Sequence, residues 1–132
     1  MLPDTWSVKV DESTGIPVVT ICGKVTVNEF VRFLSATGDM PGYWSYDKYL
    51  WDMRQVTEFP STSEIRTYAN VARSETMLSC RIAIVVDRDV HFGLARMFEM
   101  LSEHPGVVRR VFRDYDQAQI WLLTSESLQK PG

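Results

Sequence analysis

The stretch that decides the fold is Arg81 to Leu101, which reads RIAIVVDRDVHFGLARMFEML. Its first part, Ile82 to Val86, is an unbroken apolar run rich in β-branched residues, which is typical of a strand buried on both faces of a parallel sheet. Charge ends that run between Asp87 and Asp89. From Phe92 the pattern changes to that of a helix, with apolar residues spaced to form one face at Leu94, Met97, Phe98 and Leu101. The stretch therefore predicts a buried strand, a short turn and a helix that packs on the sheet.

The chain before residue 40 predicts a hairpin and a helix. Thr5 to Val10 alternates between apolar and polar residues, and Ile16 to Cys22 is a β-branched run; turn residues separate the two. Thr26 is expected to cap the helix that follows, with Glu29 completing a capping box. The buried face predicted for this helix consists of Val27, Phe30, Val31 and Leu34.

The middle of the chain predicts a third strand and a second helix. The strand is expected at Lys48 to Met53, after the aromatic stretch Tyr43 to Trp51, which is either a loop over the core or an aromatic wall for a ligand. Ser61 and Glu64 fit the capping box of the second helix. The buried stripe predicted for that helix consists of Ile65, Tyr68, Ala69 and Ala72.

The end of the chain predicts a last strand and a last helix. Val107 to Phe112 is the strand, and its two arginines, Arg109 and Arg110, favour an edge position. Asp114 is expected to cap the helix. The predicted order is thus ββαβαβαβα, an α/β fold with a mixed, mostly parallel five-stranded sheet and four helices. We expect one domain over residues 1–123 and a polar tail at 124–132.

The composition favours a soluble globular protein and narrows its partners. The 132 residues are 45% hydrophobic and 23% charged, and the net charge of −3 argues against a nucleic-acid partner. The first residues lack a signal-peptide pattern, and no segment approaches the roughly 18 apolar residues of a spanning helix. We therefore expect a cytoplasmic location, with Cys22 and Cys80 as buried free thiols.

Four segments resemble the bacterial SpoIIAA-like family, which is also described as STAS/SEC14-like. They are LWDMRQVTEF (Leu50 to Phe59), RIAIVVD (Arg81 to Asp87), FGLARMFEML (Phe92 to Leu101) and VFRDYDQAQIWL (Val111 to Leu122). The order of elements also looks like the STAS domain, the fold of the SpoIIAA anti-sigma-factor antagonists. The resemblance implies a small non-enzymatic α/β module, of a type proposed to bind non-polar ligands or membrane surfaces.

The resemblance also implies an alternative, a regulatory protein that binds a kinase or an anti-sigma-like partner. In STAS antagonists a serine at the start of the helix after the third strand is phosphorylated, within an Asp-Ser-Ser-Gly motif. Ser61 falls on that serine, but Pro60 replaces the acid and Ser63 replaces the glycine. A plain helix cap is the simpler interpretation of Ser61.

Signatures of catalysis and of metal binding are weak. Asp87, Asp89 and His91 could hold a metal beyond the end of the buried strand, but three residues on a short turn rarely converge, and acids are also favourable beside a helix N-terminus. Arg109, Arg110 and Arg113 lie close together in the sequence and form a local basic patch. The simpler interpretation of this patch is a solvated edge of the sheet, and the other interpretation is a contact with a phosphate or an anionic lipid. We expect no enzyme activity, no metal and no cofactor.

The functional hypothesis comes from the helix at Phe92 to Leu101, whose apolar surface is wider than one core-facing stripe. The extra apolar residues are explained by a thicker core, by a homodimer interface, or by a groove for a non-polar or lipid-like ligand or a membrane surface. The candidate ligand-binding residues on this helix and the preceding one are Tyr68, Val71, Phe92, Met97 and Met100.

Overall fold

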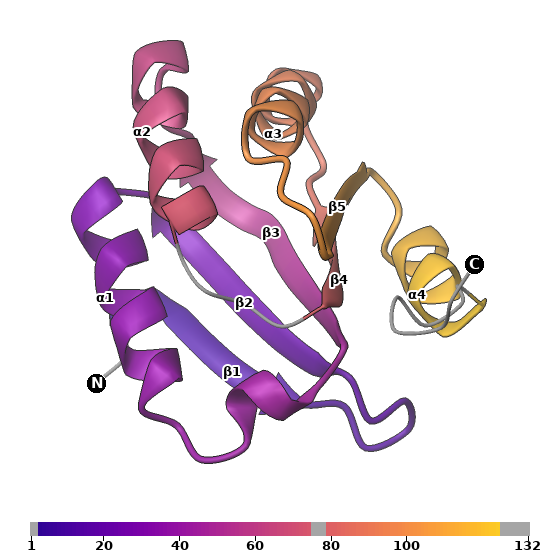
Figure 1. The fold of residues 1–132 in the computed structure, drawn as a ribbon. Helices are drawn as coiled ribbons and strands as arrows, with labels where there is room; N and C mark the ends of the chain where they lie inside the picture. The colour runs from indigo at the N-terminus through magenta and orange to yellow at the C-terminus, as the bar shows by residue number, and fades with distance from the viewer. Residues whose placement is uncertain (1–2, 75–78, 125–132) are drawn as a thin grey trace.

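The elements follow one another in the predicted order ββαβαβαβα (Figure 1). The structure is a computed structural model that describes residues 3–74 and 79–124, so residues 125–132 of the predicted tail lie outside the described residues. Its strands are β1 (Trp6–Val10), β2 (Pro17–Lys24), β3 (Lys48–Glu58), β4 (Cys80–Val85) and β5 (Val107–Phe112). Its helices are α1 (Val27–Gly38), α2 (Thr62–Ser74), α3 (Asp89–Leu101) and α4 (Tyr115–Thr124), with a short 3₁₀ turn at Tyr43–Ser45.

The five strands form one sheet whose spatial order, β1-β2-β3-β4-β5, is the order of the sequence. β1 is antiparallel to β2, and every other neighbouring pair is parallel. The predicted buried strand is confirmed, because β4 pairs on both sides and Ile82 to Val86 is buried throughout.

The helices divide unequally between the two faces of the sheet (Figure 1). Parallel crossovers are right-handed, so three that proceed in one direction place their helices on the same face. α1, α2 and α3 accordingly cover one face, and α4 covers part of the other. The larger core, under the three helices, includes Trp6, Phe30, Phe33, Trp51, Ile65 and Phe98. The smaller core, under α4, consists of Ile16, Leu50, Ala83, Val85, Ala118 and Leu122.

The predicted edge position of β5 is confirmed, but the interpretation of Arg109 as part of a solvated edge is wrong. Arg109 is only 8% exposed because it shares the α3-facing side of the strand with Val107 and Val111. Its Nη1 donates to the backbone oxygen and to Oγ of Ser102, 2.8 and 3.2 Å away, at the C-terminal end of α3. There a cation interacts favourably with the helix dipole.

The helix caps agree with the sequence in two cases and differ in two. Ser61 forms the full capping box with Glu64, and Asp114 accepts hydrogen bonds from the first turn of α4. Thr26 caps α1, but the carboxylate of Glu29 binds Thr5 Oγ1 instead of completing a box. α3 begins at Asp89 rather than Phe92, since an acid in the first turn is compatible with the helix N-terminus.

The buried faces of two helices are rotated from the predicted ones. In α1, Val31 is 45% exposed and Phe33 takes the expected place in the core. In α3, the fully buried residues are His91, Ala95 and Phe98, while Leu94, Met97 and Leu101 are partly buried at the side of the core. The stripe predicted for α2, which consists of Ile65, Tyr68, Ala69 and Ala72, is buried as expected.

Candidate functional site

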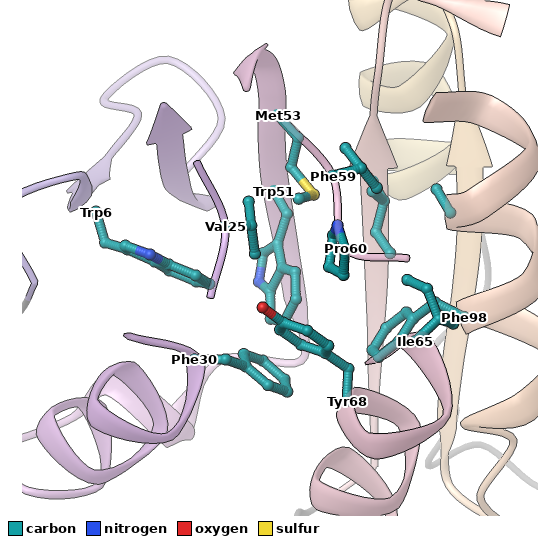
Figure 2. Close-up of a pocket in the computed structure, with 12 residues that line it drawn as sticks. Trp6, Val25, Phe30, Trp51, Met53, Phe59, Pro60, Ile65, Tyr68 and Phe98 are labelled. Carbon is teal, nitrogen blue, oxygen red and sulfur yellow. The ribbon is translucent and has the colours of Figure 1, made fainter. Parts of the chain in front are cut away.

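An apolar cavity of about 40 Å³ lies between the sheet and α1, α2 and α3 (Figure 2). Its walls combine residues that follow the carboxyl ends of β2 and β3 with residues from the sheet and the three helices. Ligand sites of parallel α/β proteins form at this end of the strands. The lining residues are Trp6, Val25, Phe30, Trp51, Met53, Phe59, Pro60, Ile65, Tyr68, Ile84, Ala95 and Phe98.

Aromatic rings make up much of the wall. Phe30 occupies the centre of the ring cluster, with its centroid 5.2 Å from that of Tyr68 and 6.1 Å from that of Trp51. Trp6 lies 6.2 Å from Phe30 on the other side. Rings at these distances attract one another, and each ring has few rotatable bonds.

Two polar atoms among the lining residues are buried without a hydrogen-bond partner in the described part of the chain, Tyr68 Oη and Trp6 Nε1. Burial, with smaller contributions from Glu64 and Glu29, raises the pKa of the Tyr68 hydroxyl above its usual value, so the group keeps its proton. An unpaired buried hydroxyl or N–H costs roughly 1–3 kcal/mol. All twelve lining residues are uncharged.

His91 contacts Phe59, one of the residues that line the cavity. Its ring stacks on Phe59 with centroids 4.5 Å apart, and its Nδ1 is buried without a partner among the described residues. Burial and the nearby Arg88 lower the pKa of His91, while Asp87 opposes them. The imidazole is therefore neutral over most of the physiological range and acts as a flat apolar surface for Phe59.

The metal site considered at the end of β4 does not assemble. His91 faces Phe59, whereas Asp87 is exposed and Asp89 forms an ion pair with Arg113. Over residues 3–74 and 79–124, no three His, Cys, Asp or Glu side chains come together as metal ligands.

The predicted basic patch does not form, and the two cysteines are free thiols. Arg109 is buried, Arg113 pairs with Asp89, and Arg110 lies over the ring of Phe112, so the three arginines do not form one surface. Both cysteines are free, as expected; Cys22 is only partly buried, and burial raises the pKa of Cys80 to about 11. A thiol that keeps its proton is a poor nucleophile.

Only one of the five candidate ligand-binding residues lines the cavity. Tyr68 does so, while Val71, Phe92 and Met97 pack partly buried against the larger core. Met100 is 67% exposed and borders a separate shallow groove. The ligand-binding role of these residues stays a prediction, but the structure does not bring them together.

Sequence reasoning missed most of the wall. Phe59 and Pro60 directly follow β3, and an apolar pair at the carboxyl end of a parallel strand was the available signal. Within the aromatic stretch, Tyr43 and Tyr49 lie in the core and Trp51 lines the cavity; an aromatic wall for a ligand stays a prediction.

Ser61 lies immediately beyond this wall, next to Pro60. The residue is exposed, and its Oγ contacts the carboxylate of Glu64 at 3.0 Å and Oγ of Ser63 at 3.2 Å. The capping role is thus present, and Ser61 is accessible from solvent.

The comparisons with known proteins concern the fold. No family model and no curated protein matches the sequence. Among solved structures, the chain is similar to an uncharacterized protein of the DUF3478 family from Shewanella loihica PV-4, whose crystal structure has a SpoIIAA-like fold. The two are 12% identical, with 89% of this chain and 91% of that chain covered and a TM-score of 0.56. The SpoIIAA-like fold that the resemblance implied is therefore confirmed.

None of the described helices has the length and apolarity needed to cross a membrane.

Proposed function

We propose that this protein is a non-enzymatic binding module for a small non-polar ligand and that the cavity under α1, α2 and α3 is its site. The observation that carries the proposal is the place and character of this cavity: it is uncharged, lined largely by aromatic residues and located where parallel strands end.

The size of the cavity limits what it holds in this conformation. An apolar cavity of about 150 Å³ admits benzene or xenon. A volume of about 40 Å³ is enough for a xenon atom or for one end of a longer molecule. A lipid-like ligand would have to enter through the partly open side and displace Phe59, Pro60 or Tyr68.

Xenon and a fluorescent fatty acid together test this proposal. Xenon reports on the closed cavity, and we expect saturable shifts of amide resonances confined to the residues around it. The fatty acid reports on whether the cavity opens far enough to admit a longer molecule, and we expect its fluorescence to change saturably with protein concentration. Absence of a saturable response to both probes in the parent protein contradicts the proposed function.

Two substitutions on the same helix give a matched comparison. Ala95→Val adds volume inside the cavity, so it should weaken xenon binding at least several-fold. Met100→Val introduces the same side chain on α3 but outside the cavity, so it should bind xenon like the parent. Equal affinities for the two variants would place any bound xenon elsewhere.

A regulator that binds a protein partner and is controlled at Ser61 is the second candidate. It is favoured by the exposure of Ser61 at the start of α2, one residue from the cavity wall. A phosphate at a helix N-terminus is stabilised by the dipole, although Glu64 is close enough to repel it. Intact-mass measurement of natively expressed protein tests this candidate, and absence of phosphate under all growth conditions would contradict it.

A further inference from the structure

We propose that the cavity recognises a hydrogen-bond acceptor on its ligand, a carbonyl on a neutral and otherwise apolar molecule, with the Tyr68 hydroxyl as the donor. This inference rests on the proposed function and specifies the class of ligand.

The first support is the contrast between two buried tyrosines. Tyr49 is 1% exposed, and its Oη lies 2.7 Å from the carbonyl oxygen of Tyr43 and 3.0 Å from that of Tyr46. Tyr68 is 5% exposed, yet its Oη has no partner among the described residues. Figure 2 shows the Tyr68 hydroxyl directed from α2 toward Trp51, among the other side chains that line the cavity. Because buried hydroxyls are nearly always paired, the hydroxyl of Tyr68 is explained by a partner that arrives with the ligand.

The second support fixes the polarity of that partner. Trp6, another lining residue, has its Nε1–H buried without a partner in the described part of the chain, and an indole nitrogen can only donate. Tyr68 keeps its proton because burial raises its pKa, so it too can donate. An acceptor therefore suits the Tyr68 hydroxyl, and it is the only kind of partner that the Trp6 N–H can take.

The third support excludes a charged acceptor. The twelve lining residues include no cation, so a carboxylate in the cavity would be buried without a counter-charge. A ketone, aldehyde or ester carbonyl accepts hydrogen bonds without that cost. The carbonyl is expected inside the cavity, with the rest of the molecule toward the partly open side.

The test uses two probes of the same shape, 2-butanone and 2-methyl-1-butene, in which a C=CH₂ group replaces the carbonyl. Dissociation constants are measured by NMR titration of the indole N–H and cavity amide resonances. The ketone loses hydrogen bonds to water on binding and the alkene does not, so each dissociation constant is first corrected for the free energy of transferring that probe from water to hexane. On this corrected scale we expect the parent protein to bind the ketone at least about 10-fold more tightly than the alkene, the effect of one well-formed hydrogen bond.

Two variants assign that preference to an atom. Tyr68→Phe keeps the ring and removes the hydroxyl, so it should bring the two corrected dissociation constants together by weakening only the ketone. Tyr49→Phe removes a buried hydroxyl outside the cavity and should leave the preference unchanged.

Each other outcome overturns a stated part of the idea. Equal corrected dissociation constants for the two probes in the parent protein overturn the acceptor inference and leave the proposed function standing. A preference that survives Tyr68→Phe overturns the role of Tyr68. If neither these probes nor xenon binds, the proposed function fails together with the inference. The comparison of the two probes in the parent protein requires no variant to fold.

Discussion

At the scale of single residues, the pairing of buried tyrosine hydroxyls should appear in stability as well as in binding. Tyr49→Phe leaves the carbonyl oxygens of Tyr43 and Tyr46 without their donor, so we expect the free energy of unfolding to fall by about 1–2 kcal/mol. Tyr68→Phe removes an unpaired hydroxyl and should leave stability unchanged or slightly raised. Urea unfolding of both variants measures the difference, and equal losses would show that the Tyr68 hydroxyl is paired in solution.

A second prediction at this scale concerns pH and His91. The pKa of His91 in the folded protein lies below its ordinary value of 6.5, so the unfolded chain takes up the proton first as the pH falls. The contribution of His91 to stability is therefore complete above about pH 6.5 and is lost as the pH decreases below that value. Unfolding free energies measured between pH 7.5 and 5 should fall in the parent protein.

His91→Phe isolates this effect, because phenylalanine can stack on Phe59 without titrating. The variant should lose part of the dependence on pH between 6.5 and 5. An identical pH profile in parent and variant would show that other groups cause the decrease.

At the scale of elements, two glycines in open surroundings should respond to alanine in opposite ways. Gly93 lies in α3 and Gly15 in the β1–β2 turn, and a Cβ at either position would meet no atom within 4 Å. Gly93→Ala should raise the free energy of unfolding by about 0.5–1 kcal/mol because alanine favours the helix. Gly15→Ala should lower it by roughly 1 kcal/mol, since φ is +73° there. Thermal unfolding checks both signs, and a shift in the same direction would contradict the helical or the turn assignment.

The C-terminal end of α3 depends on one arginine. Burial lowers the pKa of the Arg109 guanidinium to about 10, which still leaves it charged at neutral pH beside the oxygens of Ser102. Arg109→Ala should destabilise the protein by about 2–3 kcal/mol, because it unpairs those oxygens and leaves a void. Arg110→Ala, on the exposed side of the same strand, should change stability by no more than about 0.5 kcal/mol. Similar effects of the two substitutions in chemical denaturation would mean that Arg109 is not held as described.

Short sequence patterns predicted where helices and strands occur better than they predicted which face of each helix is buried. Ser61 and Asp114 marked helix starts because a cap depends on residues three or fewer positions away. The orientation of α3 instead places His91 against Phe59, which lies 32 positions earlier in the chain, so no local signal indicated this contact. Arg109 resembled a solvated residue because nothing nearby in the sequence indicates that the end of α3 covers it.

At the scale of the whole molecule, β4 should be the most protected part of the backbone. It is hydrogen-bonded to β3 and β5 and lies between the two cores. The amides of Ala83 to Val85 should exchange only through global unfolding, so their protection should equal the free energy measured with urea. Faster exchange there than in β1, an edge strand, would contradict the sheet order.

For the whole molecule, the sequence predicted the fold class but did not predict the cavity. The alternation of strands and helices, with the run Ile82 to Val86, was enough for the α/β class and the order of elements. The cavity required knowledge of which helices share a face, since its walls come from Trp6, Phe59 and Phe98, residues far apart in the chain. The five residues chosen from the amphipathic pattern accordingly included only Tyr68 among those that line the cavity.

The strand order also has a consequence for synthesis on the ribosome. Each strand pairs with the one made just before it, so the sheet can grow at a single edge as the chain emerges, with no later strand to be inserted. The larger core is complete once β5 has been made, whereas Leu50 and Val85 of the smaller core wait for α4. A chain shortened to end before Tyr115 would therefore keep all five strands and leave Leu50 and Val85 uncovered on one face of the sheet.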